Sequence, residues 1–151
     1  MTIALNTALR GTLAALLCGA GAAWAQTTFD YTAPAYGASA QAPYTGTMQT
    51  AGWVRIDTAG LSASSLILLG PRALDWRISD GIIVYTPADS AVYNGNGYTD
   101  ASGVLSMDAF SVIRPPGPHT VGQRVDSLHL FSTGAVNVRQ NGVCSSVDPD
   151  T

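Results

Sequence analysis

The chain has 151 residues, and its charged side chains are seven Arg and ten Asp, which give a formal net charge of −3. It contains no Lys and no Glu, both good helix formers, and it is rich in Gly, Ser, Thr and Val, so the composition disfavours a mainly helical protein and favours strands and turns. The acidic balance and the lack of any basic run exclude nucleic acid as an expected partner, because phosphate binding needs clustered Lys and Arg.

The N-terminal segment has the pattern of a cleaved export signal. One positive charge lies in residues 1–10, an apolar run rich in Leu and Ala fills residues 11–21, and Ala23-Trp24-Ala25 has the small-x-small pattern that a signal peptidase recognises. The apolar run is shorter than the ~20 residues that a transmembrane helix needs. We therefore expect residues 1–25 to be a signal peptide, a mature chain that begins at Gln26, and a secreted or periplasmic protein.

Two cysteines bear on processing and pairing. Cys18 raises a lipoprotein alternative, but Leu17 before it is larger than the small residue that such processing requires, so no stable membrane anchor is expected after cleavage. Residues 26–151 are long enough for one domain with its own core, and Cys144 is the one cysteine among them. No intramolecular disulfide is expected, and the alternatives of a thiol and an intermolecular disulfide remain open for Cys144.

The first part of the mature chain predicts three strands. Phe29 and Tyr31 alternate as in a short strand, and a loop follows. Residues 44–57 predict a strand that is broken or bulged near Gly52. Residues 61–70 contain a short apolar run that periodicity alone cannot assign, and we interpret it as a strand.

Asp80-Gly81 predicts a two-residue type I′ turn in a β-hairpin. Counting outward from this turn gives the pairs Ser79–Ile82, Ile78–Ile83, Arg77–Val84, Trp76–Tyr85 and Asp75–Thr86. Alternation then places on the core face Leu74, Trp76, Ile78, Ile83 and Tyr85. Trp76 and Tyr85 are thus predicted to form a cross-strand pair in the core, and Pro87 ends the hairpin.

Residues 91–113 predict a second hairpin, with its turn at residues 100–103. In its second strand the apolar residues expected on one side are Leu105, Met107, Ala109 and Ile113. Residues 114–119 hold three prolines and form a connector.

The last two predicted strands are residues 127–131 and 135–139, joined by a short turn. About seven short strands with turns at this spacing predict an all-β protein with a single antiparallel β-sandwich, a small β-barrel being the alternative. The domain is expected to span residues 26–141, and the Ser, Asp and Pro content of residues 142–151 predicts a flexible tail.

Catalytic motifs are missing from the sequence. It contains no Gly-x-Ser-x-Gly elbow, no His-Glu-x-x-His and no phosphate-binding glycine loop. His129 alternates with two leucines, which indicates an exposed strand residue and not a catalytic base. Asp108 and Asp126 allow an alternative, a hydrolase of envelope polysaccharide that uses an Asp pair, although their spacing does not select them. We therefore expect no enzyme, no catalytic residues and no cofactor.

The candidate binding site is the segment around residues 93–103, together with the aromatic N-terminal segment. Exposed Tyr and Trp rings stack on sugars because the C–H groups of a sugar ring are apolar. Oxygen-bearing side chains at alternate positions also suggest a calcium-stabilised module, but the loop lacks the later bidentate acid, so no metal ligand is assigned. The candidate binding residues are Tyr93, Asn94, Asn96, Tyr98 and Asp100.

Three turn motifs give the chain a resemblance to a known family. They are Tyr44-Thr45-Gly46-Thr47, the strand of residues 74–79 that leads to Asp80-Gly81, and Thr99-Asp100-Ala101-Ser102-Gly103. Over about residues 27–113 the chain resembles the exported β-rich domains of bacterial PEP-CTERM proteins, which are associated with exopolysaccharide-producing bacteria. It departs from them at its end, where it has no Pro-Glu-Pro and no hydrophobic span, so release or periplasmic residence is expected.

These observations predict a secreted, non-enzymatic β-sandwich of the cell envelope or extracellular matrix that mediates protein or polysaccharide contacts. A polysaccharide or an envelope protein is the expected partner. The ligand and the oligomeric state are left open by the sequence.

Overall fold

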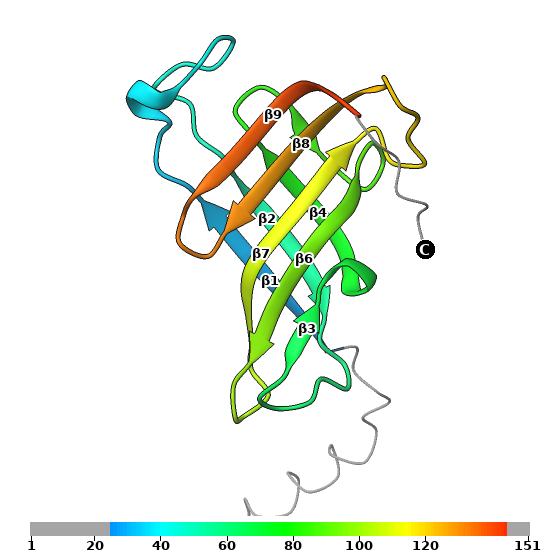
Figure 1. Ribbon diagram of the computed structural model, residues 1–151. Coiled ribbons are helices and arrows are strands. Elements are labelled where there is room, and N and C mark those ends of the chain that lie inside the picture. Colours follow the sequence, from blue (N-terminus) through cyan, green and yellow to red (C-terminus); the bar gives the residue numbers. More distant parts are fainter. Residues whose placement is uncertain (1–24, 145–151) are drawn as a thin grey trace, which may run out of the picture.

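The computed structural model describes residues 25–144, and its strands form two antiparallel sheets that face each other (Figure 1). The four-stranded sheet contains, in spatial order, β1 (Gln26–Thr32), β2 (Ala51–Asp57), β4 (Ala73–Ser79) and β5 (Val84–Tyr85). The five-stranded sheet contains β3 (Leu66–Leu68), β6 (Ala91–Thr99), β7 (Leu105–Arg114), β8 (Arg124–Phe131) and β9 (Val136–Val143). Two short 3₁₀ helices, η1 (Gly37–Ser39) and η2 (Gly70–Arg72), lie in the connections.

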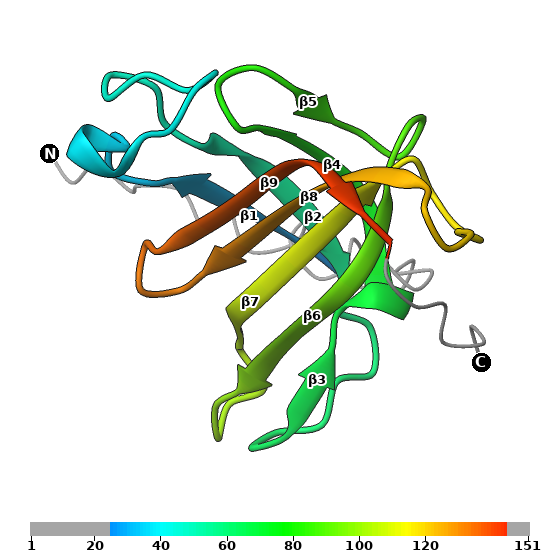
Figure 2. The same ribbon diagram turned by 45° about the horizontal axis from the view of Figure 1, so that its top comes forward.

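The predicted β-sandwich is confirmed, since the two sheets do not close into a barrel. The described residues hold nine strands where about seven were predicted. Figures 1 and 2 show that the strands of one sheet cross those of the other. The predicted signal peptide (its residues 1–24) and residues 145–151 of the predicted tail lie outside the described residues.

The core lies between the sheets and is built from inward-facing apolar side chains of both. The rings of Trp76 on β4 and Phe110 on β7 meet edge to face, with centroids 6.4 Å apart, and so join the two layers at the centre. The indole N–H of Trp76 donates to Ser90 Oγ at 3.0 Å, which satisfies its polar atom. The buried hydrophobic residues are Ala33, Val54, Ile56, Ile67, Leu69, Trp76, Ile78, Tyr85, Leu105, Phe110, Val112, Leu128 and Leu130.

The Asn-Gly-Asn-Gly segment that looks like a loop in the sequence is part of strand β6. Its two glycines face inward, where there is no room for a side chain. A Cβ atom on Gly95 would lie 3.2 Å from Leu69 Cβ and 3.3 Å from Phe110 Cδ2, and one on Gly97 would lie 2.5 Å from the Ser106 oxygen. Close packing against the core therefore explains these glycines, and no turn conformation is involved.

The hairpin at Asp80-Gly81 exists, but its predicted two-residue turn and register are wrong. Ile78 pairs with Tyr85 and Ser79 with Val84, so four residues form the connection. The shift is two residues, which keeps the alternation, so Trp76, Ile78 and Tyr85 are buried as expected and Ile83 is partly buried. Leu74, also predicted on the core face, is instead 41% exposed, because it is the extra residue at a bulge opposite β2. Trp76 is nevertheless not paired with Tyr85: its neighbour across the strands is Val54 of β2.

The wider connection follows from the buried Asp80 side chain. Its Oδ1 accepts hydrogen bonds from the backbone N–H groups of Ile82 at 2.9 Å and Ile83 at 2.7 Å. Its Oδ2 accepts from the hydroxyls of Tyr44 at 2.8 Å and Tyr85 at 3.3 Å. A type I′ turn would not bring two successive N–H groups to one carboxylate, and the carboxylate is completely shielded from solvent.

The same aspartate is tied to the long loop between β1 and β2. The Tyr36 hydroxyl donates to the backbone oxygen of Asp80 at 2.7 Å and lies 2.7 Å from Thr50 Oγ1. Burial raises the pKa of Tyr36, and burial together with the Asp80 carboxylate raises the pKa of both Tyr44 and Tyr85. These hydroxyls therefore stay protonated as donors at neutral pH.

Three other element predictions need correction. The strand predicted for residues 44–57 begins only at Ala51, and the register shift lies between Arg55 and Ile56 and not at Gly52; its extra residue is Leu74 of β4. In β7 the alternation shifts at Asp108, where two residues oppose one on β6, so the buried residues beyond it are Phe110 and Val112 instead of Ala109 and Ile113.

At the C-terminal end, both predicted strands are longer than expected. β8 begins at Arg124, and β9 continues to Val143, two residues beyond the predicted end of the domain. The connector predicted at residues 114–119 agrees with the end of β7 at Arg114.

Replacing Asp80 by Ala should destabilise the protein severely, because two backbone N–H groups and two tyrosine hydroxyls lose their acceptor in a buried site. We expect a loss of about 3–5 kcal/mol in the free energy of unfolding, measured by urea denaturation. Asp80→Asn keeps one acceptor oxygen and should lose less. Asp30→Ala on the exposed side of β1 is the matched control, with an expected change within about 0.5 kcal/mol. Equal losses for Asp80→Ala and Asp30→Ala would contradict this role.

Candidate binding surfaces

The solvent-facing side of the five-stranded sheet carries four of the five sequence-predicted binding residues. Alternation along β6 turns Asn94, Asn96 and Tyr98 outward, and a bulge at Val92/Asn94 lets Tyr93 face outward as well. Tyr93 is 67% exposed and Tyr98 is 54% exposed. We call this surface the outer face; it is formed by Leu66, Leu68, Tyr93, Asn94, Asn96, Tyr98, Ala109, Ser111, His129, Phe131 and Asn137.

A row of polar side chains crosses the outer face. Strand register places Asn94 beside Ser111, Ser111 beside His129, and His129 beside Asn137. His129 Nδ1 lies 2.9 Å from Ser111 Oγ, and the Tyr93 ring meets the imidazole edge to face at a centroid distance of 6.3 Å. His129 is thus a half-buried residue of this face, and burial lowers its pKa, so it is mostly neutral at pH 7.

Exposed apolar side chains lie beside this polar row. Leu66 of β3 is the cross-strand neighbour of Tyr98, and Leu68 is the neighbour of Asn96. On the other side, Phe131 of β8 lies next to Ala109 of β7 and is 41% exposed. The outer face therefore combines aromatic rings, aliphatic groups and amides, a mixture suited to binding other molecules.

Asp108 helps to fix this surface and does not form a catalytic pair with Asp126. Its carboxylate accepts hydrogen bonds from Asn96 Nδ2 at 3.0 Å and Ser132 Oγ at 3.1 Å. Asp126 pairs with Arg114, which lies six residues along β7 from Asp108, or about 20 Å at strand spacing. A glycosidase pair needs carboxyl groups less than about 10 Å apart, so Asp108 and Asp126 are not positioned as such a pair.

Asp100, the fifth predicted binding residue, lies in the turn between β6 and β7, where its side chain stabilises the turn. Its Oδ1 accepts hydrogen bonds from the backbone N–H groups of Ser102 at 2.8 Å and Val104 at 2.9 Å.

Among residues 25–144, no three His, Cys, Asp or Glu side chains gather in a way that could hold a metal ion. No helix within residues 25–144 is long and apolar enough to cross a membrane.

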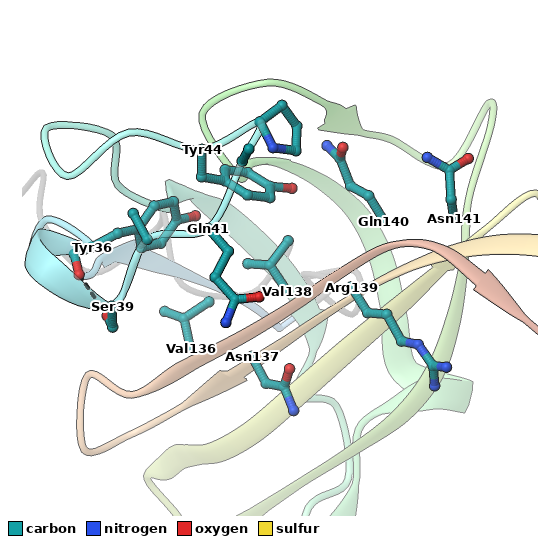
Figure 3. Close-up of a pocket in the computed structure, with 13 residues that line it drawn as sticks. Tyr36, Ser39, Gln41, Tyr44, Val136, Asn137, Val138, Arg139, Gln140 and Asn141 are labelled. Atoms are coloured by element: carbon teal, nitrogen blue, oxygen red, sulfur yellow. Dashed lines mark hydrogen bonds between the residues drawn. The ribbon is translucent and has the colours of Figure 1, made fainter.

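A second surface lies along the free edge of β9 and was not located in the sequence, although its tyrosines belong to the aromatic N-terminal segment. Here a hollow of about 630 Å³ is lined by Tyr36, by residues 39–44 and by residues 136–141. We call it the β9 groove. In Figure 3 the side chains of Val136 and Val138 point into it, whereas Asn137 and Arg139 point away.

One wall of the β9 groove is formed by Tyr36 and residues 39–44 of the loop between β1 and β2, and we call it the loop wall; contacts with the interior of the protein fix its position. The rings of Tyr36 and Tyr44 pack edge to face, with centroids 5.4 Å apart and an interplanar angle of 88°. Their hydroxyls are bound to Asp80 and Thr50 in the interior. The ring faces are therefore positioned beside the groove before any ligand binds.

Comparisons with protein-family models, curated proteins and solved structures found no match to this chain. The fold and the two surfaces define the class to which it belongs: a two-layer antiparallel β-sandwich that carries a mixed aromatic and polar face and a groove at one sheet edge.

His129 should make the fold sensitive to mild acid. Because burial lowers its pKa in the folded state, the unfolded chain binds a proton more readily, and stability should fall as pH decreases below about 6.5. His129→Gln should reduce this acid-side loss, measured as the free energy of unfolding between pH 7.5 and 5. His119→Gln is the control that should leave the loss in place. An unchanged pH profile in His129→Gln would contradict the assignment.

Proposed function

We propose that the protein is a secreted, non-enzymatic β-sandwich of the cell envelope or extracellular matrix, and that it contacts polysaccharide through the outer face. The observation that carries this proposal is the exposure of Tyr93 and Tyr98 on one strand, next to the amides of Asn94 and Asn96. A sugar ring can lay its apolar C–H face on an aromatic ring. Amide side chains both donate and accept, and so match the hydroxyls around the sugar.

The charge of the outer face agrees with a neutral or weakly charged ligand. Asp108 is the nearest carboxylate, and Asn96 and Ser132 already occupy its two oxygens. His129 is largely uncharged at neutral pH because burial lowers its pKa. A mostly uncharged surface with rings and amides therefore suits a polymer that lies across several strands.

The exposed leucines on β3 favour protein contact as the second candidate. Leu66 and Leu68 are 58% and 65% exposed and extend the face beyond the tyrosines. Clustered exposed apolar groups are a feature of protein interaction sites. If Leu66→Ser and Leu68→Ser abolish association with the envelope while the tyrosine variants retain it, the protein version is the correct one.

Alanine variants of the tyrosines test the polysaccharide version. The wild-type protein should bind the exopolysaccharide fraction of the producing bacterium saturably, as measured by affinity electrophoresis. Tyr93→Ala and Tyr98→Ala should each weaken binding about fivefold to tenfold, since one aromatic contact contributes on the order of 1 kcal/mol. Val121→Ala, an exposed apolar position outside the outer face, should change nothing. Absence of saturable binding, or equal binding by all the variants, would rule out this version.

A further inference from the structure

β9 is the terminal strand of the five-stranded sheet, so one side of its backbone is unpaired within the sheet. Phe131 N–H donates to the Ala135 oxygen at 3.1 Å, so Phe131 and Ala135 are a hydrogen-bonded pair of the β8–β9 ladder. Hydrogen-bonded pairs recur at every second residue, and therefore Asn137 and Arg139 also turn their N–H and C=O groups toward β8. Val136 and Val138 therefore turn theirs toward the free edge, as edge strands do.

The β9 groove runs along this same edge. Residues 136–141 of β9 line it, and the regular part of this stretch, residues 136–139, gives about 13 Å of extended chain before a bulge at Gln140 and Asn141. The opposite wall is formed by residues 39–44 and Tyr36. An unpaired edge and a hollow of strand length thus coincide, and together they match the shape of one extended polypeptide segment.

The groove lining indicates the chemistry of that segment. Val136 and Val138 contribute aliphatic groups from β9, and the anchored tyrosine rings contribute apolar surface from the loop (Figure 3). Gln140 Nε2 is buried and has no hydrogen-bond partner among the described residues, so it needs an acceptor such as a peptide oxygen. No Asp lines the groove, and its one charged lining residue, Arg139, points away from it in Figure 3, so the groove presents no charge to the segment.

We propose that the β9 groove binds an extended, uncharged peptide segment of a partner protein by strand addition. The backbone of the segment pairs with Val136 and Val138, and its alternate side chains enter the space between these valines and the rings of Tyr36 and Tyr44. A peptide is favoured over a sugar because N–H and C=O groups recur along an edge strand at every second residue, a spacing that only another extended backbone matches. This site uses the valines of β9, which point the opposite way from the outer-face residue Asn137, and it does not depend on the polysaccharide proposal.

The test uses the full-length chain and a blocked Thr-Val-Thr-Val-Thr-Val-Thr peptide as the probe. Adding the peptide should shift the backbone amide NMR signals of Val136 and Val138 saturably and slow their hydrogen exchange about tenfold or more. A matched peptide with N-methyl groups on alternate residues of its pairing edge cannot donate hydrogen bonds and should cause neither effect. If the unmodified peptide causes neither effect, or if the N-methylated peptide causes the same effects, the proposal is wrong.

Two variants of one residue separate edge pairing from groove packing. Val138→Pro removes an N–H that faces the free edge and leaves the hydrogen bonds to β8 intact, so it should weaken peptide binding about tenfold. Val138→Thr keeps that N–H and should bind within about threefold of wild type. Equal binding by both variants would overturn strand addition, and the N-methylated peptide decides the matter if Val138→Pro does not fold.

Three further outcomes would also overturn the proposal. Peptide-induced shifts at Asn94 and Ser111 in place of β9 would assign the peptide to the outer face. A concentration-dependent dimer without peptide, broken by Val138→Pro, would identify a second copy of the chain as the occupant. Shifts at Val136 and Val138 on addition of exopolysaccharide, with none on addition of peptide, would make the groove a sugar site.

Discussion

A carboxylate that is fully shielded from water must have its hydration shell replaced by protein donors, and in this protein that requirement acts at Asp80. The donors come from the turn after β4, from β5, and from the long loop between β1 and β2. Because Tyr44 belongs to that loop, the carboxylate joins segments that share no strand pairing. The position of the loop, and with it one wall of the β9 groove, depends on this one buried charge.

The outer face and the β9 groove differ in the interactions that fix the positions of their residues. The outer face is set by strand register, since its members lie side by side wherever β3, β6, β7, β8 and β9 pair. The β9 groove is set by side-chain hydrogen bonds, because its loop wall contains no strand. Loss of the Asp80 bonds should therefore disturb the groove while the outer face keeps its form.

Much of the fold could be predicted from the sequence, because alternation and turn residues are local signals. The hairpin at Asp80-Gly81 and the core face of Trp76, Ile78 and Tyr85 were predictable, but the register was not, since it depends on tyrosines up to 44 residues away. The close packing of Gly95 against Phe110 and of Gly97 against Ser106 could not be predicted from the sequence either, because it depends on how β6 lies against β7. The candidate residues on β6 were found by composition, whereas the β9 groove arises from loop and strand residues almost a hundred positions apart.

The loop wall beside β9 also bears on solubility. An uncovered edge strand with β-branched residues is a template for the growth of fibrils by identical chains. In β9 the valines at 136 and 138 are such residues, and Arg139 is the one charged side chain of the strand. Residues 39–44 lie beside this edge and restrict the access of a second copy of the chain. Shortening the loop would remove the groove and leave β9 as an exposed edge that is prone to aggregation.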